Sequence, residues 1–201
     1  MEQAFWQARY SQQGAAYGVE PNAFLRRQAG GLRPGSKVLV VGDGEGRNGV
    51  WLARQGMQVT TVDYAQAGID RALALASESR VNINAVCADL SDWPWPQAEF
   101  DVVVSIYLHF PSTLRTQMHQ CMLAALKPGG QVILEAFNKA QLDYPSGGPP
   151  LADALFSADL LAQDFASADI ALCQESVVEL DEGKYHVGPA AVVRLLARRL
   201  D

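Results

Sequence analysis

The sequence of 201 residues has the length of one ordinary domain, and we expect residues 1–201 to form a single unit. Its residues are 49% hydrophobic and 19% charged, which is enough for a buried core, and no apolar run is long enough to span a membrane. The formal net charge of −6 argues against a nucleic-acid-binding face.

Residues 1–30 are predicted to form two short helices, the second opened by Pro21, which together make an N-terminal helical cap. Residues 37–137 alternate apolar runs of strand length with helical patterns. Strands are expected at 37–41, 59–63, 82–87, 100–106 and 131–137, and helices at 47–55, 65–79 and 112–126. Continuous apolar strands separated by helices indicate a parallel sheet covered on both faces.

The last part of the chain, residues 138–201, has a different pattern. Residues 138–152 are rich in glycine and proline and are predicted to form a long loop of the kind that often serves as a functional lid. A helix near 157–165 is followed by strands at 170–180 and 189–197, joined by a turn at 181–188. Two strands joined by a short turn form a hairpin, so one of them must run antiparallel to the sheet.

The first strand runs into a glycine-rich turn that opens a helix. Glycines let the backbone turn sharply and approach a ligand closely, while the helix N-terminus presents free N–H groups to a polar or negative group. A turn without any ligand is the alternative at this point. The candidate ligand-binding residues of the turn are Gly42, Asp43, Gly44, Gly46, Arg47 and Asn48.

Two further acidic residues follow strands of the same predicted sheet. Asp63 ends the second strand, where a carboxylate can accept hydrogen bonds from ribose hydroxyls, although it can also cap the next helix. Asp89 and Leu90 follow the third strand, where they can reach an adenine ring; a surface turn is the alternative. Tyr64 and Ile106 complete the predicted cofactor site.

Candidate catalytic and substrate-binding residues converge on the carboxyl edge of the sheet, where ligands bind in open α/β folds. His109 follows the fourth strand and is the first candidate for a base or an orienting group, with a structural hydrogen bond as the alternative. His186, in the turn of the hairpin, is the second candidate, and His119 in mid-helix is expected to be surface or structural. The predicted substrate and lid residues are Tyr10, Tyr17, Tyr107 and Tyr185.

The cysteines of the sequence indicate neither a metal site nor disulfide bonds. The three cysteines, Cys87, Cys121 and Cys173, lie far apart and match no metal-ligand spacing, so we expect free thiols in a reducing, cytoplasmic setting and no bound metal. The only local basic excess is at the end of the chain and is expected to be a solvated face. It comprises Arg194, Arg198 and Arg199.

Several runs of the sequence resemble the class I S-adenosylmethionine-dependent methyltransferases. Residues 38–48 (VLVVGDGEGRN) resemble the first motif of their tellurite-resistance-type subgroup, and residues 59–63 resemble the ribose motif. Further similar runs lie at 9–11, 17–22, 100–103, 126–130, 147–149 and 181–188. The resemblance implies a Rossmann-like, doubly wound α/β sheet of seven strands in the order 3-2-1-4-5-7-6, with strand 7 antiparallel.

One departure concerns the methionine end of the cofactor. Many family members carry an acidic residue at the place of Val40, two residues before the first glycine, and that acid would help to orient the cofactor. We expect Asp43 or Glu45 to take its place.

The expected function is therefore methyl transfer from S-adenosylmethionine to a small-molecule acceptor, and the subgroup resemblance suggests a thiol or a metalloid such as tellurite. The cofactor is already activated, so the protein mainly aligns the reactants, and a thiol or metalloid oxyanion needs little help from a base. We expect neither nucleic acid nor membrane as a partner, and a monomer or homodimer. The alternatives are a nicotinamide-dependent oxidoreductase and a non-catalytic cofactor-binding protein.

Overall fold

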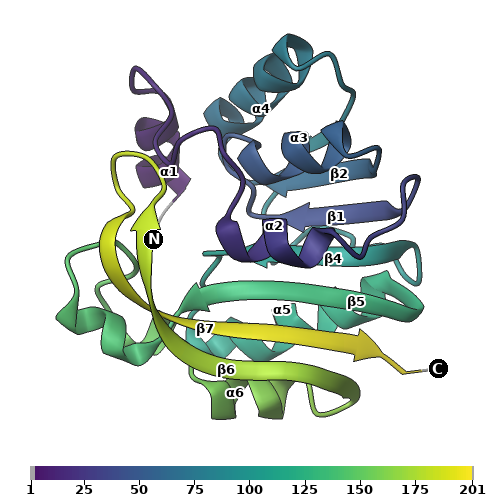
Figure 1. Cartoon of the computed structure of the whole chain (residues 1–201), viewed down its shortest axis with the longest axis vertical. Helices are drawn as coiled ribbons and strands as arrows, with labels where there is room; N and C mark the ends of the chain where they lie inside the picture. Colours follow the sequence, from purple (N-terminus) through teal and green to yellow (C-terminus); the bar gives the residue numbers. More distant parts are fainter. Residues whose placement is uncertain (1–2, 201) are drawn as a thin grey trace.

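A computed structural model describes residues 3–200 and shows one continuous sheet of seven strands (Figure 1). The strands are β1 (Lys37–Val41), β2 (Gln58–Asp63), β3 (Asn84–Cys87), β4 (Phe100–Ile106), β5 (Leu126–Phe137), β6 (Ala168–Asp181) and β7 (Val187–Arg199). Their order is β3-β2-β1-β4-β5-β7-β6. Neighbours among β1 to β5 pair in parallel, whereas β7 is antiparallel to both β5 and β6. The predicted strand order and the antiparallel seventh strand are confirmed.

Helices cover both faces of this sheet, as predicted. They are α1 (Gln3–Tyr10), α2 (Ala23–Ala29), α3 (Arg47–Arg54), α4 (Gln66–Glu78), α5 (Ser112–Ala125) and α6 (Ala158–Asp164), with short 3-10 turns η1 (Lys139–Asp143) and η2 (Ala152–Ala154). Side chains of α2 and α3 pack on one face of the central strands, and side chains of α5 and α6 pack on the other (Figure 1).

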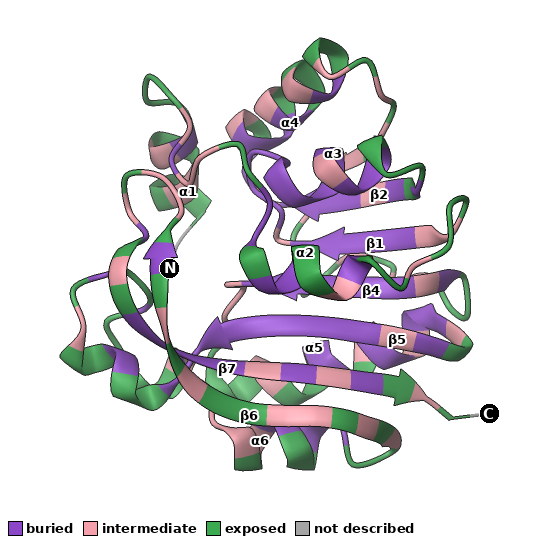
Figure 2. Ribbon diagram, in the orientation of Figure 1, coloured by how far each residue is buried: buried purple, intermediate pink, exposed green. Residues whose placement is uncertain are grey.

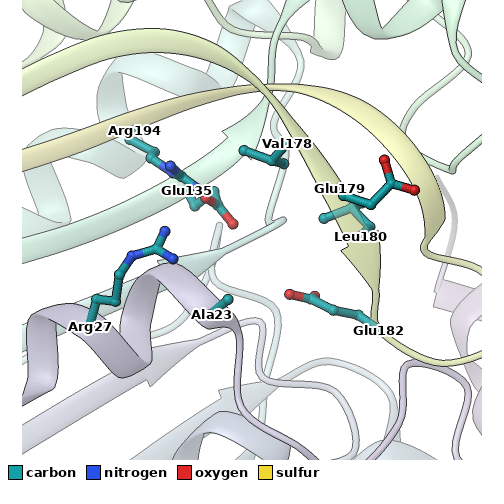
Figure 3. A pocket seen from close by; sticks show the side chains of 8 residues that line it. All are labelled: Ala23, Arg27, Glu135, Val178, Glu179, Leu180, Glu182 and Arg194. Atoms are coloured by element: carbon teal, nitrogen blue, oxygen red, sulfur yellow. The ribbon is translucent and has the colours of Figure 1, made fainter.

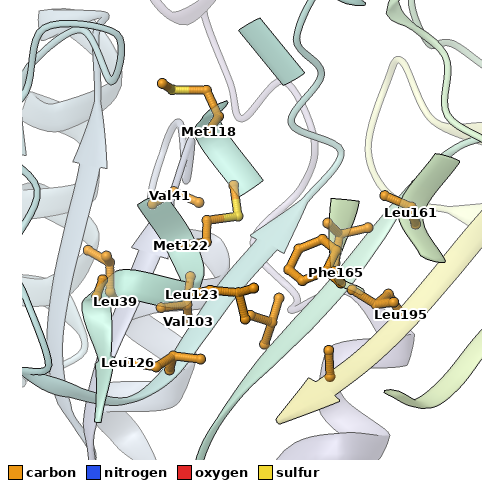
Figure 4. Packing of buried hydrophobic residues seen from close by; sticks show 14 of the residues in the cluster. Leu39, Val41, Val103, Met118, Met122, Leu123, Leu126, Leu161, Phe165 and Leu195 are labelled. Atoms are coloured by element: carbon orange, nitrogen blue, oxygen red, sulfur yellow. The ribbon is translucent and has the colours of Figure 1, made fainter. Parts of the chain in front are cut away.

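The core lies on both sides of the central strands, which are buried along almost their whole length (Figure 2). Under α5 and α6, Met118, Met122 and Phe165 meet Leu39 and Val103 of the sheet (Figure 4). Each of these five side chains is almost fully buried. Burial of a large apolar side chain contributes roughly 1.5–3 kcal/mol, so this core holds the sheet edge rigid beneath the site.

The parallel strands all end at one edge of the sheet, and two segments distant in the sequence meet above it. Helix α1 and the turn between β6 and β7, residues 182–186, lie side by side there (Figure 1). The glycine turn that follows β1 lies at the same edge, so the topology brings the candidate residues into one region. Within residues 3–200, no helix has the length and apolar character needed to cross a bilayer.

Some boundaries differ from the predictions for identifiable reasons. Helix α2 begins at Ala23 rather than at Pro21, because the Asn22 side chain accepts the amide hydrogen of Leu25 and acts as its N-cap. The third strand begins at Asn84, two residues late. Strand β5 already starts at Leu126, with an irregular register against β4 before Val102. The predicted loop 138–152 contains η1 and the start of η2. Residues 1, 2 and 201 of the predicted unit lie outside the described residues.

Candidate functional site

The glycine turn after β1 adopts a backbone that other residues rarely reach. Gly42, Gly44 and Gly46 have φ values of 63°, 56° and 84°, in the left-handed region. A Cβ at Gly46 would lie 2.6 Å from the Cβ of Ala72 on α4, so the turn also packs closely against that helix. The positive φ values favour glycine at these three positions, and the turn lies at the carboxyl edge of the sheet.

Asp63, at the end of β2, faces this turn. Its Oδ2 accepts the amide hydrogen of Gly44 at 2.9 Å, and its Oδ1 accepts that of Ala65 at 2.9 Å. Burial raises the pKa of Asp63, while these backbone hydrogen bonds lower it. The carboxylate and the glycine turn are therefore joined directly, with no bulky group between them. Asp63 also binds the start of the next segment, so the ligand-binding and the capping interpretations are compatible.

The structure distinguishes Asp43 from Glu45, the two residues expected to replace the acid that is missing at Val40. Both carboxylate oxygens of Glu45 are occupied, Oε2 by the amide of Ala16 at 2.7 Å and Oε1 by Arg71 at 2.5 Å. Asp43 Oδ2 accepts hydrogen bonds from Gly49 and Thr61, but its buried Oδ1 has no partner among the described residues. Asp43 is therefore the acid that retains an open oxygen at the turn.

Burial has a strong effect on Asp43. Loss of solvent raises the pKa of Asp43 from its ordinary value of 3.8 to about 7, although Thr61 and Gly49 oppose the shift. A positively charged group beside the unpartnered oxygen would favour the ionised form. The turn thus has one acid with a pKa near neutral pH, which a cationic group beside it would lower.

The segment after β3 has a rigid turn at the same edge of the sheet. Asp89 Oδ1 accepts hydrogen bonds from the backbone and hydroxyl of Ser91, and the indole N–H of Trp95 donates to the carbonyl of Leu90 at 2.9 Å. Asp89 is exposed and Leu90 is buried. Neighbouring Tyr64 is half-buried, and burial raises the pKa of its hydroxyl to about 12. These contacts fix the predicted adenine-binding residues.

Two side chains lie directly on the glycine turn. A Cβ at Gly44 would lie 2.5 Å from the Tyr10 hydroxyl, and one at Gly42 would lie 2.8 Å from Leu108 Cδ1. Tyr10 is only 6% exposed and comes from the end of α1. Tyr10, predicted as a lid residue, therefore covers the glycine turn; its role as a lid stays a prediction.

The N-terminal segment and the hairpin turn form a joint cover, which we define as residues 10–18 together with residues 182–186. A Cβ at Gly183 would lie 2.3 Å from the backbone nitrogen of Gly18, so the two segments meet backbone to backbone. The Arg9 guanidinium donates to the Tyr17 hydroxyl at 2.7 Å and lies 3.9 Å from the centre of the Tyr185 ring. The predicted lid residues Tyr17 and Tyr185 are thus in one cluster.

Arg47 and Asn48 connect the glycine turn to this cover. Arg47 Nη2 lies 2.6 Å from Glu182 Oε2, and both side chains are nearly buried. Asn48 Oδ1 accepts the backbone amide of Asn22 at 2.9 Å. Burial alone would raise the pKa of Glu182. The neighbouring His186 and Arg47 side chains lower it, and the pKa lies below its usual value. Both residues, predicted as cofactor ligands, have protein partners here.

A buried polar network lies at the ends of β4 and β5. Glu135 Oε1 accepts hydrogen bonds from Asn22 Nδ2 at 2.6 Å and from the Tyr107 hydroxyl at 2.9 Å. Glu135 Oε2 pairs with Arg194 Nε at 2.5 Å across the β5–β7 ladder. Tyr107 has a φ of 54°, and such strain in a bulky residue is typical of functional sites.

The sequence analysis missed three members of this region, Asn22, Glu135 and Glu182, and it placed Arg194 on a solvated face. The structure corrects that last expectation, because the Arg194 side chain is only 13% exposed. The missed signal was Glu135 itself, a charged residue inside the otherwise apolar strand QVILEAF. A buried carboxylate requires a partner, so it pointed to a nearby cation.

The surroundings of His109 are those of a structural histidine. Its Nδ1 lies 2.8 Å from the carbonyl oxygen of Ala154, and its Nε2 accepts the amide of Phe137 at 3.2 Å. Burial lowers the pKa of His109 to about 4, so the ring is neutral with both nitrogens occupied. The structural alternative considered for His109 therefore fits this arrangement better than the role of a base. Ile106 is also buried, in the apolar cluster beneath α2.

His186 is in a different situation. Its ring centre lies 4.5 Å from that of Tyr17 and 4.7 Å from that of Tyr107. Its Nδ1 is buried, has no hydrogen-bond partner among the described residues, and lies 4.0 Å from Glu182 Oε2. Burial lowers the pKa of His186, which leaves a neutral imidazole with an available nitrogen at the sheet edge.

His119 is structural and fully buried, not a surface residue. Its Nδ1 lies 2.8 Å from Asp164 Oδ2, and Arg115 binds the same carboxylate at 2.7 Å. Burial alone would raise the pKa of Asp164, but hydrogen bonds from His119 and Arg115 lower it strongly. This ion cluster fastens α6 to α5 on the far face of the sheet.

Comparison with known proteins shows which families the sequence is similar to, independently of the geometry of the site. Residues 38–130 match the sequence profile of a family described as "Methyltransferase domain". The ubiquinone biosynthesis O-methyltransferase of Erwinia tasmaniensis is 34% identical over 119 residues, 58% of this chain and 48% of that protein. The 2-heptyl-1-hydroxyquinolin-4(1H)-one methyltransferase of Mycobacteroides abscessus is 28% identical over 115 residues, 56% of this chain and 51% of that protein. The chain thus spans about half the length of the curated relatives it matches.

Solved structures share the fold over nearly the whole chain. TehB from Haemophilus influenzae aligns with a TM-score of 0.73 at 20% identity, over 98% of this chain and 66% of that chain. A structure described as "Conversion of a Disulfide Bond into a Thioacetal Group during Echinomycin Biosynthesis" aligns with a TM-score of 0.79 at 21% identity, covering 98% and 93%. With the strand order and the glycine turn, these findings make the chain similar to the class I S-adenosylmethionine-dependent methyltransferases, whose fold it shares.

Proposed function

We propose that this protein transfers a methyl group from S-adenosylmethionine to a small-molecule acceptor. The observation that carries the proposal is the direct contact of the Asp63 carboxylate with the amide of Gly44, at the end of β2 and the glycine turn after β1. In doubly wound sheets this is the place where a carboxylate binds ribose hydroxyls beside a glycine-rich turn. The nicotinamide alternative shares this geometry but gains no support from the relatives.

The residues at the turn fit the cofactor. Asp43 Oδ1 is a buried oxygen without a partner among the described residues, as a binding site for the cofactor's ammonium group requires. Asp63 would bind the ribose, and Asp89 and the Leu90 backbone would bind the adenine. The bound cofactor supplies an activated methyl group on a sulfonium; the protein holds both reactants in line and excludes water.

On the acceptor side, we propose that His186 takes the proton from the nucleophile. Its neutral ring and available Nδ1 suit a hydroxyl or thiol acceptor, which must lose a proton during transfer. Glu182, 4.0 Å away, would stabilise the protonated ring. The relatives include O-methyltransferases, which favours a hydroxyl acceptor. The motif resemblance favours a thiol or a metalloid acceptor. A metalloid oxyanion needs little help from a base, so His186 would then be dispensable.

The test is calorimetric titration of the purified protein with S-adenosylhomocysteine and with NADH, followed by methyl transfer to a panel of phenols, thiols and tellurite. We expect binding of S-adenosylhomocysteine, no binding of NADH, and transfer to at least one phenol or thiol. Binding of NADH without S-adenosylhomocysteine would refute the proposal, and so would binding without transfer to any acceptor.

A further inference from the structure

A cavity of about 350 Å³ lies beside the buried network, between α2, the ends of β5 and β7, and the hairpin end of β6 (Figure 3). Its volume is in the range of small-molecule sites. The lining residues are Ala23, Arg27, Glu135, Val178, Glu179, Leu180, Glu182 and Arg194.

The two buried carboxylates of the lining already have partners. Both oxygens of Glu135 are bound, by Asn22 and Tyr107 on one side and by Arg194 on the other. Glu182 Oε1 accepts a hydrogen bond from Asn22 at 3.1 Å, and its Oε2 pairs with Arg47. These acids therefore have little capacity left to attract a cationic ligand.

The guanidinium groups, by contrast, retain unused donors. Arg194 uses its Nε for Glu135 and stacks over the Phe24 ring at 4.9 Å, but its terminal nitrogens have no hydrogen-bond partner in residues 3–200. Arg27 has no hydrogen bond or ion pair within those residues, and its guanidinium points into the cavity (Figure 3). Glu179 is exposed, and its carboxylate is turned away from both arginines in this view.

We propose that this cavity is the acceptor pocket and that it selects a small acceptor carrying a carboxylate, bound between Arg27 and Arg194. The proposal rests on the methyltransferase function argued above. Two guanidinium groups with free N–H donors match the oxygens of a carboxylate, and Arg194 is already held in place by Glu135 and Phe24. Charge-assisted donors of this kind favour the ionised group over a neutral analogue.

The position of the cavity relative to the proposed base supports this assignment. A second cavity of about 280 Å³ shares Ala23, Glu179 and Glu182 with the first and is also lined by Tyr17. The Tyr17 ring lies against His186. An acceptor with its carboxylate at Arg27 and Arg194 would therefore extend along this groove towards the side where the proposed base lies.

The test uses benzoate as a simple carboxylate probe and benzamide as its neutral analogue, titrated calorimetrically into the full chain. We expect benzoate to bind in the millimolar range or tighter and benzamide not to bind. The variant Arg27→Gln should weaken benzoate binding about tenfold, as expected for one charge-assisted hydrogen-bonding group. Arg26→Gln is the matched control. Arg26 is also exposed on α2 and its replacement removes the same charge, but Arg26 does not line the cavity.

A second variant, Arg194→Lys, keeps a positive charge opposite Glu135 but removes the forked donors, and it should also weaken benzoate binding. With a phenol or thiol acceptor that also carries a carboxylate, Arg27→Gln should raise KM and leave kcat nearly unchanged. Equal effects of Arg26→Gln and Arg27→Gln, equal binding of benzamide, no benzoate binding, or an unchanged KM would each overturn the proposal.

Failure of this proposal can be told apart from failure of the enzyme assignment. S-adenosylhomocysteine binding should be the same in Arg27→Gln and in the unaltered protein, because Arg27 lies away from the glycine turn. Absence of benzoate binding in the unaltered protein, with normal S-adenosylhomocysteine binding, would refute the pocket alone. Benzoate binding without any binding of S-adenosylhomocysteine would instead refute the proposed function.

Discussion

Arg47 and Glu182 form an ion pair of 2.6 Å that joins the helix after the glycine turn to the turn between β6 and β7. The side chains are 8% and 11% exposed. Because a buried charge is costly without its partner, this pair couples the cofactor side of the site to the cover above it. Several experimental consequences follow from this link and from its neighbours.

Replacing Glu182 by Gln should lower the free energy of unfolding by about 2 kcal/mol, because the buried Arg47 loses its counter-charge. The measurement is urea unfolding followed by circular dichroism. The matched control is Glu99→Gln, which removes an exposed pair with Lys37 at 3.3 Å and should cost less than about 1 kcal/mol. Equal losses in the two variants would contradict the proposed importance of the buried pair.

Asp63→Asn should weaken S-adenosylhomocysteine binding about tenfold or more, because the carboxylate proposed to accept both ribose hydroxyls becomes an amide with a single acceptor oxygen. Calorimetry gives the affinity, and thermal unfolding shows whether the turn itself has been damaged. Asp70→Asn on α4, where the side chain is bonded only to exposed Gln66, serves as the control. An unchanged affinity in Asp63→Asn would remove this residue from the cofactor site.

Asp43 should release protons when the cofactor binds near neutral pH. Its pKa is raised to about 7 by burial, and a cationic ammonium group at the open oxygen would lower it. Calorimetry in two buffers of different ionisation enthalpy measures the released protons directly. Asp43→Asn should abolish the release. Heats that do not depend on the buffer would show that no group of this kind titrates on binding.

The same residue predicts a pH dependence of stability. A folded pKa of about 7 lies above the ordinary value of 3.8, so the folded state holds the proton more tightly than the unfolded state does. The stabilising contribution is complete below pH 3.8 and is lost as the pH rises through 7. The melting temperature should therefore fall relative to that of Asp43→Asn across this interval. A constant difference would contradict the assigned pKa.

His186→Gln should reduce kcat about a hundredfold or more with a hydroxyl acceptor if His186 is the base. Burial lowers the pKa of His186, so the activity of the unaltered protein should rise with pH through a value below 6.5 and then level off. The variant should lose that rise. His109→Gln should instead lower the melting temperature and keep the shape of the pH profile; exchanged behaviours would reverse the two roles.

Gly183→Ala should detach the N-terminal segment from the hairpin turn, because the new Cβ would collide with the backbone of Gly18. Gly188→Ala is an informative control: both positions have positive φ, at 70° and 94°, but nothing lies within 4 Å of a Cβ at Gly188. Hydrogen exchange of residues 10–18 should accelerate in the first variant only. Similar exchange in both would mean that backbone strain, not the contact, controls the cover.

The features that could be predicted depend on neighbouring residues in the sequence. Those that could not depend on contacts between residues far apart in the sequence. Apolar strands such as Lys37–Val41 and the glycine turn are encoded locally, so their positions could be predicted. The sheet order followed from the family resemblance and not from a local pattern. The bond between Asn22 and Glu135 joins residues 113 positions apart and depends on how α2 docks on the sheet. No local pattern specifies that pairing, so the roles of Glu135 and Glu182 emerged only in three dimensions.

His109 and His186 show the same limit within the candidate site. Both follow from the topology as neighbours of the sheet edge, and sequence position alone ranked His109 first. The carbonyl of Ala154 and the amide of Phe137 bind the two ring nitrogens of His109. By contrast, His186 Nδ1 has no hydrogen-bond partner among the described residues. Such partners come from loops whose course a sequence pattern does not define.

The backbone contact between Gly18 and Gly183 also bears on how the protein is made. Translation delivers residue 183 roughly 10–30 s after residue 18 at ordinary elongation speeds. During that interval β1 to β5 can pair on the ribosome while half of the cover does not yet exist. The N-terminal segment, with Tyr10 over the glycine turn, would therefore lack its backbone contact with the hairpin until residues 182–186 have been made.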